Sequence, residues 1–182
     1  MLKIIFAVLI MLFQELRAEA RIRSESKQKP TATWISDEQY RKYLQAQTKE
    51  RITPEAIRFL EPNEVFVFGS NDRGAHNGGA ARLAVQRFGA RMGVASGPQG
   101  QCYAIPTVGA GIGPDEIRAE FHRLVEYAVA HPEKIFLVTA LGCGHGGYDP
   151  DTMSRMLEEG INVPNIHFPM AFWNEFKGRG LV

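Results

Sequence analysis

Two short apolar runs, each followed by a glycine-rich segment, constrain this chain most. Residues 65–68 read Val-Phe-Val-Phe and lead into Gly69 and the later pair Gly78-Gly79. Residues 135–138 read Ile-Phe-Leu-Val and lead into the segment 142–147, which holds four glycines. Short apolar runs rich in β-branched and aromatic residues are typical of strands buried on both faces. The sequence therefore predicts two buried strands that end at Gly69 and after Val138, each followed by a glycine-rich turn.

Helical patterns alternate with the predicted strands. The segment 79–88 carries its apolar residues on one face, and Gly89 is placed to end that helix. The segment 114–131 begins at Pro114 and has apolar residues at i, i+4, i+7, i+8 and i+11, counted from Ile117. We also expect strands over residues 102–105 (ended by Pro106) and 165–168, loops over 91–101 and 108–113, and helices over 36–49, 53–60 and 171–176. Another helix should run through Leu157, capped by Asp149 or Asp151.

Alternation of strands and helices favours a layered α/β domain with a mainly parallel sheet. If the strands over 65–68 and 135–138 are parallel, both glycine-rich turns lie at the same edge of the sheet, where open α/β sheets bind ligands. A turn that leads into a helix directs backbone N–H groups and the positive helix end toward one point, which suits a phosphate. Two such turns on one sheet would suit a diphosphate.

Composition restricts the classes of function. The net charge of +1 gives no overall electrostatic reason to expect nucleic acid as a partner, although a local basic patch stays open. The two cysteines, Cys102 and Cys143, form no Cys-x-x-Cys motif, so neither a zinc site nor another metal or cofactor is expected. A disulfide between them stays open. The dinucleotide motif Gly-x-Gly-x-x-Gly and the phosphate-loop motif Gly-x-x-x-x-Gly-Lys-Ser/Thr are both missing after the first strand.

The first fifty residues predict targeting and connecting segments. Lys3, an apolar run over residues 4–13 and the small-x-small sequence 18–20 form the pattern of a secretory signal peptide, with cleavage after Ala20. The run is too short for a stable membrane span. Residues 21–50 are interpreted as a polar linker followed by a helix, and residues 51–182 as the globular domain. We expect an exported protein if the signal is genuine and a cytoplasmic one otherwise; an internal helix or a misplaced start are the alternatives.

Several side chains in the two turns are candidates for chemistry. Asp72 and His76, in the first turn, are the candidates for positioning a water molecule, and each has a purely structural alternative as a cap. Cys143, flanked by glycines and followed by His145, is a candidate nucleophile; a small apolar filler in a tight loop is the alternative.

The motifs around these turns resemble a known family. They are Val-Phe-Val-Phe-Gly-Ser-Asn (65–71), His76 with Gly-Gly-Ala-Ala (78–81), Gly-Gln-Cys-Tyr-Ala-Ile-Pro-Thr (100–107) and Val-Thr-Ala-Leu-Gly-Cys-Gly (138–144) with Gly-Tyr (147–148). Over about residues 53–169 the chain is similar to a macrodomain-like family of small bacterial and phage proteins, and more loosely to the ADP-ribose-binding macrodomains. The resemblance implies a three-layer α/β fold, a mixed and mainly parallel sheet with helices on both faces.

The resemblance also implies a ligand and residue roles. The ligand would be ADP-ribose or a related nucleotide-diphosphate sugar, free or on a modified target, with Asn71 orienting the distal ribose and the two turns holding the diphosphate. The chain departs from the family at Asn77 and at His145-Gly146, and it shows no counterpart of the acidic residue that contacts adenine. Binding of this ligand is the expected function, and whether the chain also removes ADP-ribose from a target stays open. A non-catalytic binding module and a hydrolase using Cys143 are the alternatives. The expected ligand-binding residues are Gly69, Ser70, Asn71, Gly78, Gly79, Ala80, Gly142, Cys143, Gly144, His145, Gly146, Gly147 and Tyr148.

Overall fold

The fold is described from a computed structural model, which defines residues 51–182. The predicted signal peptide, linker and helix over 36–49 lie outside the described residues. Residues 51–182 belong to one compact unit, and no helix within them has the length and apolar character needed to cross a membrane.

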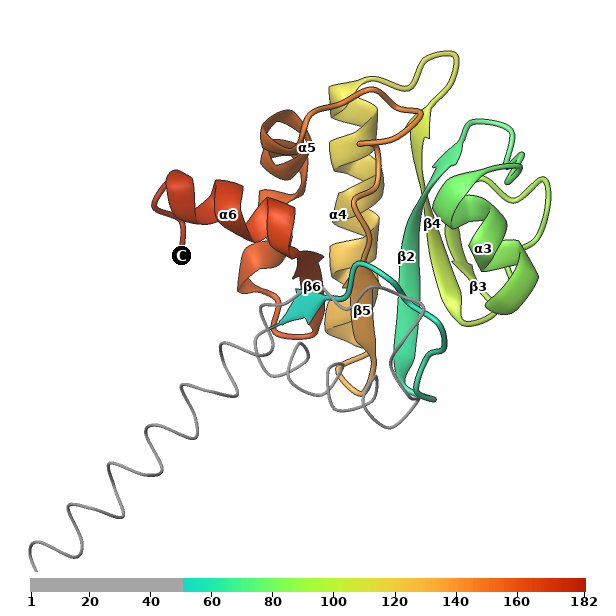
Figure 1. Cartoon of the computed structure of the whole chain (residues 1–182), viewed down its shortest axis with the longest axis horizontal. Helices are drawn as coiled ribbons and strands as arrows, with labels where there is room; N and C mark the ends of the chain where they lie inside the picture. Colours follow the sequence, from blue (N-terminus) through green and yellow to red (C-terminus); the bar gives the residue numbers. More distant parts are fainter. Residues whose placement is uncertain (1–50) are drawn as a thin grey trace, which may run out of the picture. The chain divides into compact units, whose positions relative to one another are not determined.

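A six-stranded mixed sheet forms the centre of the domain (Figure 1). Its strand order is β1-β6-β5-β2-β4-β3. All neighbouring pairs are parallel except β3 and β4, which are antiparallel. The strands span Ile52–Thr53 (β1), Glu64–Asn71 (β2), Gly97–Gln99 (β3), Cys102–Val108 (β4), Ile135–Val138 (β5) and Ile166–Pro169 (β6). The predicted α/β class with a mainly parallel sheet is confirmed.

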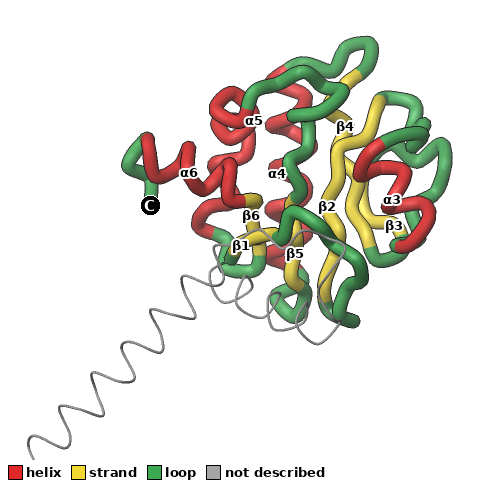
Figure 2. Tube along the Cα trace, viewed as in Figure 1, coloured by secondary structure: helices red, strands yellow, loops and turns green. Residues whose placement is uncertain are grey.

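Helices cover both faces of this sheet (Figures 1 and 2). One core cluster joins α4, α5 and α6 to sheet residues such as Val67 and Val138, and the other joins α3 to residues such as Phe66 and Phe68. Alternate residues of β2 thus enter opposite cores, as expected for a strand that is covered on both faces. The helices span Gly79–Arg87 (α3), Pro114–Ala130 (α4), Pro150–Leu157 (α5) and Met170–Gly178 (α6), with a 3-10 helix over Glu158–Asn162 (η1).

Several sequence predictions are confirmed within a residue or two. Helix α3 begins at Gly79 and is followed by Gly89 in the left-handed conformation, at φ +80°. Helix α4 begins at Pro114 and buries the five apolar residues of the predicted face: Ile117, Phe121, Leu124, Val125 and Ala128. Periodicity identified these elements because the same residues that define the pattern fill the core.

The predicted helix over residues 53–60 is wrong. Ile52 and Thr53 form β1 and pair with Phe168 and Pro169 of β6, and the segment that follows is irregular. The Thr53 hydroxyl does not cap a helix; it donates to the His167 carbonyl at 2.8 Å. Ile57 then packs into the α3 core. Tertiary pairing has overridden a local capping signal.

Strands β2 and β4 extend further than predicted, and β3 was not predicted as a strand. Strand β2 continues through Gly69 and Ser70 to Asn71, so these three residues belong to the strand and not to the turn. Strand β4 continues past Pro106 to Val108. Because β3 pairs with β4 only as far as Ala104, one side of β4 is unpaired at Pro106, and proline is tolerated at such an edge. Strand β3 itself falls in the segment predicted as loop.

Candidate functional site

The two glycine-rich turns lie at the same edge of the sheet. Strands β2 and β5 are adjacent and parallel, with Val67 opposite Val138. Just past β5, Thr139 bonds back to β2, its backbone N–H and its hydroxyl both donating to the Val67 carbonyl, at 3.0 and 2.9 Å. The segments 72–78 and 139–149 therefore both leave from the carboxyl ends of neighbouring strands, as predicted.

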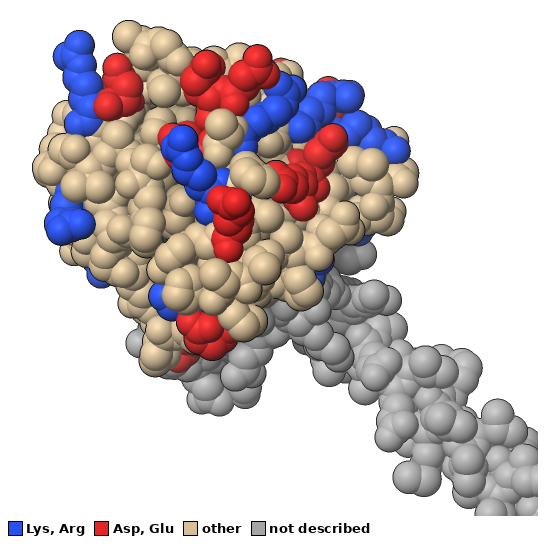
Figure 3. Space-filling view, turned by 180° about the vertical axis from the view of Figure 1, so that it is seen from behind, with Lys and Arg blue, Asp and Glu red and all other residues tan. Residues whose placement is uncertain are grey.

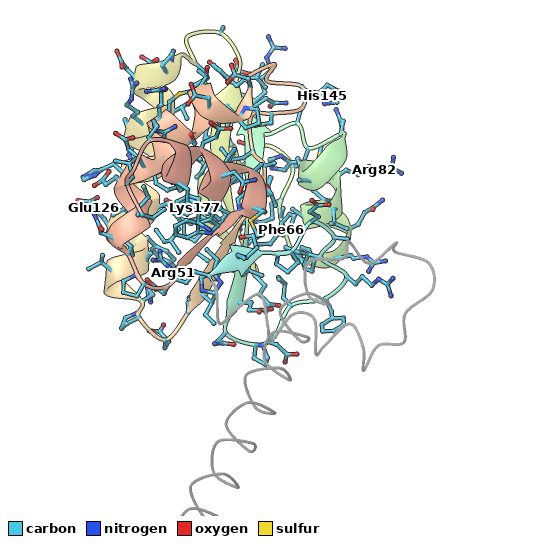
Figure 4. All side chains as sticks on the ribbon, turned by 60° about the vertical axis from the view of Figure 1, so that its left-hand side comes forward. Arg51, Phe66, Arg82, Glu126, His145 and Lys177 are labelled. Carbon is cyan, nitrogen blue, oxygen red and sulfur yellow. The ribbon has the colours of Figure 1, made fainter. Side chains whose placement is uncertain are left out.

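The second turn also lies close to the end of β2 and to the start of α3. A Cβ atom built on Gly69 would lie 3.3 Å from the backbone nitrogen of Gly142. A Cβ atom built on Gly78 would lie 3.6 Å from Cε1 of His145, so the imidazole reaches across to the start of α3 (Figure 4). A side chain at Gly69 would be tightly packed against the second turn. The turns thus form one continuous rim.

In the first turn, the side chain of Asn71 stabilises the loop itself. Its Oδ1 accepts from the backbone N–H groups of Arg73 and Ala75, at 3.1 and 2.9 Å, and its Nδ2 donates to the Ala75 carbonyl at 3.0 Å. One amide hydrogen is left for another partner. Gly74, at φ +62°, packs against the backbone of Val94, where a Cβ would lie 2.5 Å from nitrogen.

Ser70 and His76 lie beneath this turn. Both are buried, with the Ser70 hydroxyl donating to the Ala95 carbonyl and His76 Nε2 lying 3.1 Å from the Val94 carbonyl. The His76 ring packs edge-on against Phe68, and its Nδ1 has no partner among residues 51–182. The positions of these two side chains support the loop from below.

Asp72 connects the first turn to a third loop, over residues 109–113. Its Oδ2 accepts from the Ala110 N–H at 3.1 Å, and its backbone N–H donates to Val108 O at 3.1 Å. Gly109 has φ +145° and leaves no room for a Cβ beside the Asp72 carboxylate. The sequence predicts only a loop over residues 109–113 and no functional role for it. The sequence feature that could have indicated such a role is the alternation of glycines at 109, 111 and 113 directly after a strand.

The second turn is a tight backbone structure. Tyr148 N–H donates to the Gly142 carbonyl at 3.2 Å, and Gly147 N–H to the Gly144 carbonyl at 3.0 Å. Gly142, at φ +77°, faces Met153 of α5 so closely that a side chain would collide with it. Gly146 lies directly on Gly142, with a built Cβ only 2.5 Å from its oxygen. These contacts fix the loop, whereas nothing lies within 4 Å of a Cβ built on Gly144 or Gly147.

Cys143 is partly buried against the core that contains α4 and α5. Burial is the main cause that raises the pKa of its thiol, and the nearby Asp149 carboxylate adds to the effect. A raised pKa lowers the fraction of thiolate, the nucleophilic form. Cys143 and Cys102 are both free thiols, so no disulfide joins them.

Asp149 is the cap of α5. It accepts from the backbone N–H and the hydroxyl of Thr152, at 2.9 and 2.7 Å, and these bonds lower the pKa of its carboxyl group. Of the two carboxylates that the sequence offered as cap, the structure selects Asp149.

The start of α3 offers backbone donors. Its N-cap is Gly78, which has no side chain to cap the helix, and no acidic residue lies in its first turn. Gly78 and Gly79 are exposed, Ala80 is half-buried, and His145 is exposed beside them. First-turn N–H groups without a capping side chain are available as donors to water or to an anion. Within residues 51–182, no group of three or more metal-binding side chains is assembled. Comparisons with protein-family models, curated proteins and solved structures gave no match for this chain.

Proposed function

We propose that the rim formed by the segments 72–78 and 139–149 binds ADP-ribose or a related nucleotide-diphosphate sugar, in a macrodomain-like three-layer fold. The proximity of the His145 side chain to Gly78, 3.6 Å from the position that a Cβ would take there, carries the proposal, because it brings both turns to one helix start. Gly78, Gly144 and Gly147 are exposed, so a ligand can approach the backbone of the rim at these positions. Gly78, Gly79 and Ala80 supply donors to one phosphate. Residues 142 and 144–146, whose N–H groups are not used by the backbone bonds within the turn, supply donors to the other.

Calorimetry with ADP-ribose tests this proposal. The informative variant is Gly144→Ala, because a Cβ at Gly144 meets no protein atom and the backbone there is not left-handed, so the added methyl enters only the space of a ligand. The matched control is Gly178→Ala in α6, where a Cβ is equally unhindered. We expect Gly144→Ala to weaken ADP-ribose binding at least about tenfold, or about 1.4 kcal/mol, and Gly178→Ala to leave it unchanged. Absence of heat with the unaltered chain at millimolar ADP-ribose would refute the proposal.

Binding without turnover is favoured by the surroundings of the catalytic candidates. His76 is buried and lies within hydrogen-bond distance of the Val94 carbonyl, whereas the Asp72 carboxylate accepts from the Ala110 N–H. Of these two catalytic candidates, only Asp72 is exposed. If the protein releases ADP-ribose, water adds to the distal ribose carbon as the bond to the target breaks, and Asp72 accepts the water's proton. Asp72→Asn keeps an oxygen acceptor for Ala110 and removes the base.

Release of ADP-ribose from a modified protein separates the two candidates. No release by the unaltered chain, together with binding in the calorimeter, assigns a binding module. Release that Asp72→Asn slows without weakening binding assigns an enzyme. Cys143→Ala is the control for a cysteine hydrolase. We expect any release of ADP-ribose to persist in this variant. Complete loss of release would overturn both the binding module and the enzyme that uses Asp72.

A further inference from the structure

Charge is unevenly distributed along the domain. The segment 72–114, which contains α3 and the loops on either side of it, holds four arginines and one carboxylate. The segment 115–182 holds ten carboxylates against six lysines and arginines. The net charge of +1 is therefore the sum of about +3 over residues 72–114, about −4 over residues 115–182 and about +2 over residues 1–71, and it conceals local attraction for an anion.

The four arginines, called here the arginine face, differ from the arginines of segment 115–182 in their partners. They are Arg73, Arg82, Arg87 and Arg91, all exposed. None of them belongs to an ion pair formed within residues 51–182. In contrast, Arg118 and Arg155 pair with Asp115 and Asp151, at 2.8 and 3.1 Å. Figure 3 shows basic and acidic side chains next to one another on one face of the molecule.

Local structure groups the arginine face around α3. Arg82 and Arg87 belong to the helix, and Arg82 points outward from it (Figure 4). The loops that carry Arg73 and Arg91 lie side by side, because the Gly93 N–H donates to the Gly74 carbonyl at 2.9 Å. The nearest carboxylate in sequence, Asp72, is held by the N–H of Ala110 in the loop after β4.

We infer that the arginine face, which includes Arg73 of the rim, binds the phosphate backbone of a nucleic acid. All four cations are arginines, whose planar guanidinium groups bind phosphate through two parallel hydrogen bonds. The large hydrophobic side chains exposed within residues 51–182 include no aromatic ring on which a base could stack. Recognition therefore rests on phosphates and does not depend on base sequence.

The number of arginines fixes the expected salt dependence. Four phosphate contacts on a single strand give a slope of log K against log salt of about −2.8. Affinity should then fall about 50-fold when the salt concentration is raised fourfold. Any DNA binding by the basic residues of segment 1–50 persists in variants of the arginine face. These variants therefore separate the two contributions to the affinity.

Fluorescence anisotropy of the full chain with a labelled single-stranded DNA tests the inference. We expect the double variant Arg82→Glu, Arg91→Glu to lose at least about tenfold in affinity and to give a shallower salt slope. Neither side chain has a partner within residues 51–182, so folding is preserved, and circular dichroism verifies it. The control, Arg118→Glu with Arg155→Glu, makes the same change in net charge and should bind within about threefold of the unaltered chain.

Two results would overturn the inference. Equal losses in both double variants would show that net charge, and not the arginine face, governs binding. Equal displacement of the DNA by polyglutamate and by unlabelled DNA would instead assign the face to an acidic protein. Because no ADP-ribose is present, failure of this experiment leaves the proposed function untouched.

Discussion

At the scale of single residues, the glycines of the rim have different tasks. Gly74 has both a left-handed backbone and backbone atoms of Val94 where a side chain would stand. Gly144 has neither constraint. A glycine such as Gly74 is required by the fold, and a glycine such as Gly144 keeps the backbone accessible to a ligand.

Gly74→Ala should therefore destabilise the domain strongly. The new Cβ would lie 2.5 Å from the nitrogen of Val94, and the backbone at φ +62° disfavours alanine. We expect a loss of about 3 kcal/mol in the free energy of unfolding, measured by urea denaturation. Gly144→Ala is the matched control and should stay within about 0.5 kcal/mol of the unaltered chain; equal stability of the two variants would contradict this account.

His167 should make stability depend on pH. Burial is the main cause that lowers its pKa, to about 4, and the charge of Arg51 contributes; its Nδ1 has no partner within residues 51–182. The unfolded chain, with an ordinary histidine pKa of about 6.5, binds the proton first, so stability falls as pH drops from about 6.5 to about 4.

Over that pH interval, protonation linked to His167 lowers the free energy of unfolding by about 3 kcal/mol. Urea midpoints measured from pH 7 to pH 4.5 should fall more steeply for the unaltered chain than for His167→Gln, which cannot titrate. Parallel profiles for the two proteins would exclude His167 as the cause.

At the scale of elements, Arg51 connects β1 to the segment around η1. Its guanidinium donates to four backbone carbonyls, Gly160, Ile161, Val163 and Ile166, at 2.7 to 3.4 Å. Its charged group also lies over the Trp173 ring of α6, 5.4 Å from the centroid. The carbonyls of Gly160, Ile161 and Val163 lie at the end of η1, where such groups need donors from outside the helix. Ile166 is the first residue of β6. One side chain thus joins an edge strand to two other elements.

Arg51→Lys should weaken this junction although the charge is kept. A lysine ammonium cannot span four carbonyls in the geometry of the guanidinium fork, so we expect a loss of about 2 kcal/mol in thermal or urea unfolding. Arg118→Lys, at an exposed ion pair on α4, is the control and should cost less than about 0.5 kcal/mol. If Arg51→Lys lowers the free energy of unfolding no more than Arg118→Lys does, the hydrogen bonds of Arg51 do not stabilise the fold.

At the scale of the whole molecule, a ligand at the rim should stabilise the entire domain. The rim joins loops from β2 and β5, whose residues reach both cores, so binding is coupled to global unfolding. At a concentration of 100 times Kd, ADP-ribose should add about 2.7 kcal/mol to the free energy of unfolding. Thermal melts should show the shift in Gly178→Ala and, at the same ligand concentration, a smaller one in Gly144→Ala; equal shifts would place the ligand elsewhere.

The sequence by itself determined the elements whose signal is local. The apolar runs at 65–68 and 135–138 and the periodic segments from Gly79 and Pro114 became β2, β5, α3 and α4, because the residues that make the pattern are those that the core buries. The meeting of two glycine-rich turns followed from the rule that parallel strands end at one edge.

Only the tertiary structure decided what depends on a distant partner. Thr53 pairs with β6, and Pro106 stays in a strand because its outer side is free. His76 and Asp72 look alike in sequence as catalytic candidates, yet one is buried beneath the turn and the other is bonded to a third loop. Burial and hydrogen bonding across the chain are set by long-range packing, which no local pattern encodes.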